Sequence, residues 1–292
     1  MKTGKLADKF IVDDRKKFKL KDFDPADTAH WRSKEHAEES LQEGIARTAE
    51  LQDKLYAQDR WALLLIFQAM DAAGKDGAIK HVMSGVNPQG CEVHSFKAPS
   101  EVELQHDFLW RTTCKLPERG HIGIFNRSYY EEVLVVRVHP EILANEKTPP
   151  SLVGKKIWEE RFEDICGFER HMARGGTVIR KFFLHVSKKE QKKRFLARLD
   201  EPEKNWKFSS GDIHERKYWD DYQDAYEDMI GNTSTKHAPW YIVPADNKWF
   251  TRLVISSVIV DTLESLDLRY PKVEGPKLRE LEEAKHLLTS KS

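Results

Sequence analysis

Short apolar runs alternate with longer amphipathic segments along most of the chain. The clearest run, Ala62–Phe67, is bounded by charged and small residues, which predicts a strand buried on both faces of a parallel sheet. Similar patterns predict four further strands, at Cys91–Phe96, His121–Phe125, Thr177–Val186 and Trp240–Val243. Apolar residues spaced by three or four predict long helices at Lys34–Gln58, at Lys155–Arg174 and from Lys248 to about Leu266. This alternation predicts an α/β fold, with a five-stranded parallel sheet flanked by helices and ligand sites at the carboxyl ends of the strands.

Capping signals place the shorter helices. Ser100 with Glu103 forms a capping box, which predicts a helix that continues through Leu109. Another helix is predicted to begin near Ser128, and Asp246 is expected to cap the last core helix.

A helical hairpin is predicted at about 190–230. It begins with the densest basic cluster of the chain, at 188–198, and continues through a polar stretch with Gly and Pro at 201–214 into an acidic and aromatic helix. A hairpin with a mobile tip fits this order, although a basic run is more often only a solvated face. The expected organisation is an N-terminal arm and amphipathic helix (1–58), a core that contains the hairpin (59–270) and a charged tail (271–292).

The composition limits the classes of protein. The 292 residues, 39% hydrophobic and 33% charged, suffice for one large α/β domain or two small ones. Lys+Arg and Asp+Glu balance at 48 each, so an anion site must be a local cluster. The 3 cysteines show neither CxxC nor a zinc-ligand pattern, which indicates a reducing compartment. Since no apolar run is long enough to cross a bilayer or to form a signal segment, a cytoplasmic location without membrane association is expected. The helix at 34–58 could pack on the core or on a second subunit, and a homo-oligomer is expected.

The segment after the first strand has the layout of a phosphate-binding loop. A small-residue loop leads to Gly74-Lys75, and apolar residues at helical spacing follow. In such a loop the backbone N–H groups form an anion nest, the helix dipole adds partial positive charge, and Lys75 adds a full one. The match to G-x-x-x-x-G-K-[ST] is imperfect, because Ala69 replaces the first Gly and Asp76 replaces the hydroxyl residue. The alternative is a purely structural connection, in which Gly74 permits close packing and Asp71 favours the helix N-terminus.

Further polar residues are expected near this loop. Asn126 and Arg127 follow the third strand, and the basic hairpin supplies cations. Phosphoryl transfer needs such a set, because Lys, Arg, backbone N–H groups and Mg²⁺ position and neutralise the transferred group. Asp71 is the candidate Mg²⁺ ligand, or it orients the attacking phosphate, and a local loop cap is the alternative. Lys and Arg with interleaved aromatics also suit nucleic acid, but the neutral overall charge argues against that partner.

Taken together, these motifs resemble the second family of polyphosphate kinases, which move a phosphoryl group between inorganic polyphosphate and a nucleotide. The resemblance covers about 55–263. It is carried by DAAGKDG (71–77), SFKAPS (95–100), DFLWR (107–111), FNRSYYEEVLVVRVH (125–139), NWKFSSGD (205–212) and APWYIVPADNKW (238–249).

The resemblance implies a three-layer P-loop kinase fold with a helical-hairpin lid, in which the loop holds polyphosphate where relatives hold ATP. The residues implied as catalytic are Asp71, Lys75, Asn126 and Arg127, with Asp71 as metal ligand. The residues implied as substrate-binding are Ala72, Ala73, Gly74, Asp76, Gly77 and Glu131 around the loop, with Arg194, Arg198, Lys204 and Lys207 in the lid.

The form NRS-x-YE, with Glu131 where other members have Asn, resembles members that accept nucleoside monophosphates as well as diphosphates. The hypothesis is therefore a reversible transfer from polyphosphate to AMP and ADP, and to guanine nucleotides, with Mg²⁺ as cofactor and Mn²⁺ as an alternative metal. Two departures affect the metal site: Asn126 replaces an Asp of other members, and Asp76 replaces a small residue. The alternatives are an ATP-dependent nucleoside monophosphate kinase and a non-catalytic polyanion-binding module.

Overall fold

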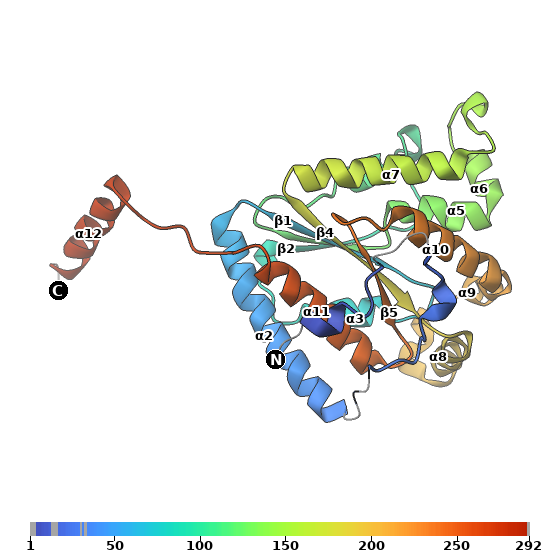
Figure 1. The fold of residues 1–292 in the computed structure, drawn as a ribbon, viewed down its shortest axis with the longest axis horizontal. Helices are drawn as coiled ribbons and strands as arrows, with labels where there is room; N and C mark the ends of the chain where they lie inside the picture. The colour runs from blue at the N-terminus through green and yellow to red at the C-terminus, as the bar shows by residue number, and fades with distance from the viewer. Residues whose placement is uncertain (1–3, 13–16, 30, 32–33, 291–292) are drawn as a thin grey trace.

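A parallel sheet of five strands forms the centre of the molecule in a computed structural model that describes residues 4–12, 17–29, 31 and 34–290 (Figure 1). The strand order is β2-β3-β1-β4-β5, and every neighbouring pair is parallel. The strands are β1 (Ala62–Gln68), β2 (Cys91–Ser95), β3 (Ile122–Asn126), β4 (Thr177–His185) and β5 (Trp240–Pro244). The predicted sheet is thus confirmed, and the carboxyl ends of all its strands meet at one edge.

Helices cover both faces of the sheet. Helices α1, α2 and α3 pack around α11 on one face, and α5, α7 and α10 pack together on the other (Figure 1). The apolar face of α2 lies against α11 of the same chain, so the expectation of an oligomer cannot rest on that face. The helices are α1 (Gly4–Ala7), α2 (Lys34–Gln58), α3 (Lys75–Val82), α4 (Trp110–Thr113), α5 (Val135–Val138), α6 (Pro140–Asn145), α7 (Ile157–Arg174), α8 (Lys188–Asp200), α9 (Ser210–Glu215), α10 (Trp219–Thr233), α11 (Lys248–Glu264) and α12 (Pro276–Thr289).

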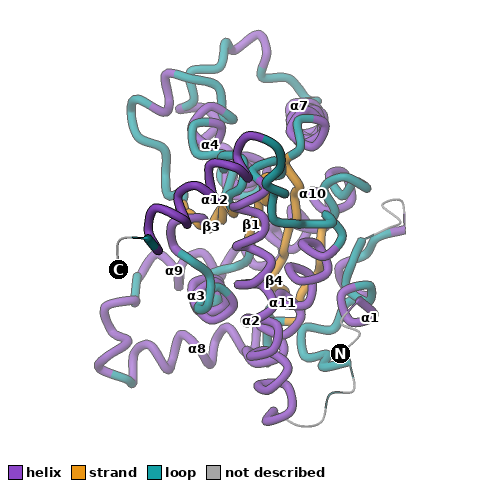
Figure 2. The backbone as a smooth tube through the Cα atoms, turned by 90° about the vertical axis from the view of Figure 1, so that its left-hand side faces the viewer, coloured by secondary structure: helices purple, strands orange, loops and turns teal. Residues whose placement is uncertain are grey.

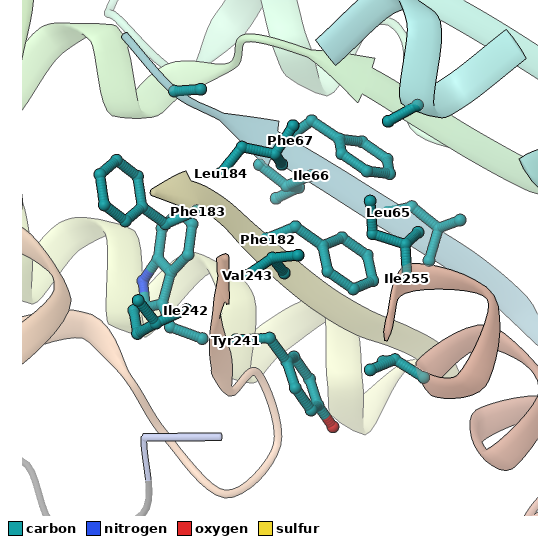
Figure 3. Packing of buried hydrophobic residues seen from close by; sticks show 14 of the residues in the cluster. Leu65, Ile66, Phe67, Phe182, Phe183, Leu184, Tyr241, Ile242, Val243 and Ile255 are labelled. Atoms are coloured by element: carbon teal, nitrogen blue, oxygen red, sulfur yellow. The ribbon is translucent and has the colours of Figure 1, made fainter. Parts of the chain in front are cut away.

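The core is densest where β1 and β4 run side by side. All seven residues of β1 are buried, because helices cover both of its faces. Phe67 stacks on Phe182 with ring centroids 4.9 Å apart, and Phe182 lies 5.8 Å from Tyr241 (Figure 3). The central strand, and with it the start of the following loop, is therefore held rigidly.

Two predicted helices are shorter than expected. The capping box forms, since the Ser100 N–H donates to the Glu103 carboxylate at 2.6 Å, but only a 3₁₀ turn (Glu103–Gln105) follows. His106 is extended, and the Asp107 carboxylate accepts the Leu109 N–H and so starts a new turn.

The segment after Ser128 forms a 3₁₀ helix (Tyr129–Val133) and then α5, which are separated by the non-helical Leu134. Here the prediction of one helix was wrong. Both tyrosine hydroxyls of this segment donate to the same buried oxygen of Glu169, which draws it into a tighter turn. 

The predicted cap of α11 is also wrong. The Asp246 carboxylate accepts the N–H and the hydroxyl of Ser187 at 2.8 and 2.7 Å, while Asn247 occupies the N-cap position without a side-chain hydrogen bond to the helix. Because the Ser187 hydroxyl caps α8 through the Glu190 N–H, Asp246 joins the start of α8 to the start of α11.

The hairpin extends from the sheet edge through α8, short turns and α9, and returns through α10 (Figure 2). The 3₁₀ helix Pro202–Lys207 forms its tip, where the Arg198 guanidinium pairs with Asp212 at 3.0 Å and the Asn205 amide donates to the Arg198 carbonyl. These bonds fold the tip back over the carboxyl ends of the strands.

The two ends of the described chain differ in their contacts with the sheet. The backbone of Phe10 and Val12 bonds to the edge strand β5, and the C-terminal helix α12 stands apart from the body with no buried residue (Figure 1). Within the described ranges, no helix is long and apolar enough to cross a membrane.

His185, the last residue of β4, makes the fold sensitive to acid. Burial lowers its pKa to about 4 from the ordinary 6.5, against the opposing charge of Asp246. Between these values the unfolded chain binds a proton that the folded protein does not, so stability falls as the pH drops from 6.5 to about 4. We expect His185→Gln to remove about 3 kcal/mol of the stability lost between roughly pH 7 and pH 4. The measurement is the difference between the two pH curves of unfolding free energy in urea, and parallel curves would contradict the assignment.

Candidate active site

The loop between β1 and α3 is shaped to hold an anion. Ala72 and Gly74 adopt left-handed backbone conformations, with φ of 60° and 105°, and α3 begins at the next residue, Lys75. Gly74 suits this conformation because it lacks a Cβ, whereas Ala72 adopts it at a cost in strain. A backbone in which left-handed and right-handed residues alternate turns successive N–H groups toward one point, in line with the positive end of the helix dipole. The predicted layout of strand, small-residue loop and helix is present at 71–77, and phosphate binding by this loop stays a prediction.

Arg194, expected as a lid contact to phosphate, instead braces this loop. Its guanidinium donates to the carbonyls of Ala72 and Ala73 at 3.1 and 2.6 Å, and to those of Ala245 and Asp246 at 2.6 and 3.2 Å. Its Nε donates to the Glu190 carboxylate at 2.9 Å. All five N–H donors are therefore engaged. Arg194 joins the loop, α8 and the start of α11 into one unit.

Arg127 lies between two carboxylates at the end of β3. Its Nη2 is 3.1 Å from Asp71 and its Nη1 is 3.8 Å from Glu131. Its backbone is left-handed, with φ of 65°, and its N–H donates to the carbonyl of Phe67. A strained conformation held by the central strand aims the guanidinium at the phosphate loop.

Lys75 and Glu131 lie in the same electrostatic cluster. Lys75 Nζ donates to the Ala69 carbonyl at 2.9 Å, and burial followed by the charge of Arg127 lowers its pKa. Burial raises the pKa of the Glu131 carboxyl, while Arg127 and Lys75 act in the opposite direction. An incoming phosphate would stabilise the charged forms of Lys75 and Arg127, because only a few carboxylates lie near these two cations.

Asn126 is close to the loop but does not face Asp71 and Glu131, the two carboxylates beside Arg127. Its amide nitrogen donates to the Asp76 carboxylate at 2.7 Å, which links the end of β3 to the first turn of α3. The two departures from the family pattern thus contact each other. 

A cavity of about 910 Å³ opens above the loop. All the predicted site residues line it except Glu131, whose carboxylate lies 3.8 Å from the Arg127 guanidinium. Its charged lining comprises nine cations, Lys75, Lys97, Arg127, Arg194, Arg198, Lys204, Lys207, Lys248 and Arg252, against three carboxylates, Asp71, Asp76 and Asp212. This excess of positive charge in a neutral protein is the local cluster that a polyanion requires.

Sequence reasoning missed three of these cations. Lys97 and Lys248 lie within the quoted stretches SFKAPS and APWYIVPADNKW, but neither was assigned a role, and Arg252 lies outside every quoted motif. For Lys97 and Lys248 the available signal was their position, because each lies a few residues beyond the carboxyl end of a strand; Arg252 lies one helical turn after Lys248.

A family model described as Polyphosphate kinase 2 (PPK2) matches residues 30–271. The chain belongs to this family. This membership confirms the prediction that the protein is a phosphotransferase of the P-loop kinase type.

Individual relatives agree with that classification over nearly their full length. The chain is 56% identical to an ADP-polyphosphate phosphotransferase of Rhodopseudomonas palustris, with 91% of this chain and 95% of the relative covered. It is 46% identical to an AMP/ADP-polyphosphate phosphotransferase of Meiothermus ruber, with 91% and 96% covered. It also resembles the crystal structure of polyphosphate kinase 2 from Arthrobacter aurescens TC1, with a TM-score of 0.88, 40% identity and 98% and 97% covered.

The carboxylates of this polyphosphate kinase suit a divalent metal ion that is shared with substrate. No group of three or more His, Cys, Asp or Glu that could hold a metal occurs in the described part of the chain. Mg²⁺ usually binds through one or two protein carboxylates together with substrate phosphates and water. Asp71, a hard oxygen donor at the start of the loop, fits that role, and Asp76 is a second carboxylate within the loop.

Proposed function

We propose that this polyphosphate kinase transfers a phosphoryl group reversibly from polyphosphate to AMP and ADP, and to guanine nucleotides, with Mg²⁺ or Mn²⁺. The observation that carries the proposal is the position of Arg127, between Asp71 and Glu131 and beside the phosphate loop. The names of two close relatives, which specify ADP and AMP/ADP, support the choice of acceptors. A cytoplasmic location and a homo-oligomeric state stay predictions.

The loop and Lys75 hold the donor. The N–H groups of residues 72–77 surround the phosphate next to the bond that breaks, and Lys75 turns from the Ala69 carbonyl to a phosphate oxygen. Arg194 does not contact substrate in this scheme. It keeps the loop in its left-handed shape, so that the N–H groups need no reorganisation during the reaction.

Arg127 stabilises the phosphoryl group in transit. An oxygen of the acceptor's terminal phosphate forms the new P–O bond, and the bridging P–O bond of polyphosphate breaks, which leaves a chain one phosphate shorter. The acceptor phosphate is largely ionised at neutral pH, so no protein base is needed. Asp71 orients the guanidinium through the bond at 3.1 Å. A metal held by Asp71 would neutralise part of the negative charge of both substrates.

The test incubates the purified full-length chain with Mg²⁺ and with AMP, ADP or GDP, each with polyphosphate or ATP as donor. We expect ADP to form from AMP, and ATP from ADP, when polyphosphate is the donor. We also expect the reverse transfer, in which ATP supplied with a short polyphosphate chain gives ADP and a longer chain. Transfer from ATP alone would indicate a nucleoside monophosphate kinase instead. Salt-dependent binding of polyphosphate without turnover would indicate a binding module.

Glu131 is expected to adjust the preference between acceptors. ADP carries about one more negative charge than AMP, and removal of a carboxylate beside Arg127 makes the site more positive. Glu131→Gln should therefore lower the ratio of kcat/KM for AMP to that for ADP by about tenfold.

The control is Glu141→Gln, which removes a carboxylate that is 69% exposed and pairs with His139. This control should leave the ratio unchanged. An equal effect of both substitutions, or none at Glu131, would refute the role of Glu131 in acceptor choice.

A further inference from the structure

Gln68 is a buried polar residue that the reaction scheme leaves without a role. It ends β1, directly before the phosphate loop, and its exposed fraction is 0%. Among the described residues, neither its amide nitrogen nor its amide oxygen has a hydrogen-bond partner. An amide buried in this way costs stability, because it gives up water without gaining a bond in return. A residue that carries such a cost beside the active site calls for a functional explanation.

The side chain of Gln68 lies on the same face of the sheet as Glu131. Phe67 packs on the face that α11 covers, and successive residues of a strand point to opposite faces (Figure 3). Gln68 therefore points to the other face, as does its neighbour in β4, Phe183, whose ring lies 4.3 Å from that of Tyr226 in α10. Burial raises the pKa of Tyr226, and the nearby charge of Glu131 raises it further. Gln68 and Glu131 thus share the space between the sheet and α10.

The Glu131 carboxylate lies near Arg127 without a hydrogen bond to it. Arg127 Nη2 donates to Asp71 at 3.1 Å, whereas its Nη1 stays 3.8 Å from Glu131. Burial raises the pKa of the Glu131 carboxyl, and Arg127 and Lys75 oppose this rise. The Gln68 amide opposes it as well, so the amide approaches the carboxylate, although without regular hydrogen-bond geometry. Glu131 is therefore placed between a cation and a neutral amide.

A Glu131 carboxylate in direct contact with Arg127 would compete with substrate. Hydrogen bonds between a guanidinium and a carboxylate are among the strong ones in proteins, and a small rotation of the Glu131 side chain closes a gap of 3.8 Å. Such a contact would occupy the second arm of the guanidinium, because Asp71 already holds the first. A neutral donor on the other side of the carboxylate counteracts this movement.

We propose that Gln68 is a positioning residue that holds the Glu131 carboxylate back from Arg127 Nη1. This inference rests on the proposed function, in which Arg127 stabilises the phosphoryl group in transit. The NH₂ group of Gln68 attracts a carboxylate oxygen, so Nη1 keeps its N–H donors for substrate. Glu131 then contributes its charge to the choice of acceptor without capturing the cation that the transfer needs.

The test measures ATP formation from polyphosphate and ADP by the full-length Gln68→Met variant. Methionine has a similar length and volume, but it cannot donate a hydrogen bond. We expect kcat to fall about tenfold with little change in the KM for ADP, because one charge-assisted contact of Arg127 with the transition state is diverted. The urea midpoint should not fall, because the substitution removes a buried amide that has no partner. A purely structural role predicts the opposite, a lower midpoint with an unchanged kcat.

The double variant Gln68→Met/Glu131→Gln tests whether Gln68 acts through Glu131. Once the carboxylate is gone, it can no longer capture Arg127, so kcat of the double variant should lie within about twofold of that of Glu131→Gln alone. If Gln68 acts independently of Glu131, the fall of about tenfold will recur in both backgrounds, and the proposal is then wrong.

The matched control is Gln52→Met, at a glutamine of α2 that is 2% exposed and does not line the cavity. This control should leave kcat unchanged. If Gln68→Met does not fold, Gln68→Asn should lower kcat by about the same factor, because its amide stops one methylene short of Glu131. 

An unchanged kcat in a folded Gln68→Met variant would overturn the role of Gln68 even if polyphosphate remains the donor. Failure of the unaltered enzyme to use any polyphosphate would instead refute the proposed function. The two failures are therefore distinguishable.

Discussion

Arg127→Ala will lower kcat for transfer from polyphosphate to ADP by about 10³-fold, or about 4 kcal/mol of transition-state stabilisation. The reason is that, in the proposed mechanism, the guanidinium held by Asp71 at 3.1 Å stabilises the group in transit. Lys75→Ala should cause a loss of similar size, since no other ammonium group lies within the loop itself. Steady-state rates of ATP formation, with product separated by chromatography, measure both effects.

The control for Arg127 is Arg127→Lys, which keeps the charge but loses the planar pair of donors. We expect it to recover only a small part of the rate. Far-UV circular dichroism and the urea midpoint should match those of the unaltered protein for all three variants, because these side chains lie at the cavity. A folded Arg127→Ala variant with a near-normal rate would remove Arg127 from the mechanism.

Lys181→Met will destabilise the fold by about 3–5 kcal/mol, because it leaves the Glu169 carboxylate buried without its counter-charge. Both side chains have an exposed fraction of 0%, and Lys181 Nζ lies 2.7 Å from Glu169 Oε2. The same ammonium donates to the Tyr130 hydroxyl and to the Thr233 carbonyl at 2.7 and 2.8 Å. Equilibrium unfolding in urea, followed by tryptophan fluorescence, measures the loss.

The matched control is the double variant Lys181→Met/Glu169→Gln, in which the uncompensated charge is gone and an amide oxygen still accepts from Tyr129 and Tyr130. It should recover about half of the stability, by about 2 kcal/mol. If the double variant is no more stable than Lys181→Met, the buried charge is not the cause. Since Tyr129 and Tyr130 follow Arg127 closely in the chain, Lys181→Met should also lower kcat.

The elements that were predicted well are those whose signal is local. The run Ala62–Phe67 and the spacing of apolar residues in 34–58 predicted β1 and α2 to within one residue. A strand buried on both faces shows a continuous apolar run, and a helix buried along one stripe shows apolar residues at regular spacing, so both patterns can be recognised from neighbouring residues. The short segments after Ser100 and Ser128 failed for the complementary reason. Their capping residues are present, but other contacts decide how far each helix continues: the first is interrupted by the competing local turn at Asp107, and the second is shaped by the distant Glu169.

The roles of the site residues depend on contacts between distant parts of the chain. Arg194 and Arg198 belong to the same basic helix and look alike in the sequence. Both line the cavity, but Arg194 donates to carbonyls of two loops, whereas Arg198 pairs with Asp212. Only the packing of α8 against the phosphate loop shows that Arg194 braces the loop and that Arg198 is free of the loop and can contact substrate.

By itself, the sequence determined the order of the strands and long helices, the strand–loop–helix layout around 71–77 and the family, because each depends on residues close together in the chain. The tertiary structure alone decided the charge of the cavity. Lys97, Arg127, Lys204 and Arg252 come from four separate segments, and their grouping arises when the parallel sheet brings the carboxyl ends of its strands to one edge. A neutral chain thus acquires a strongly positive cavity, since folding redistributes its charges in space without altering their number.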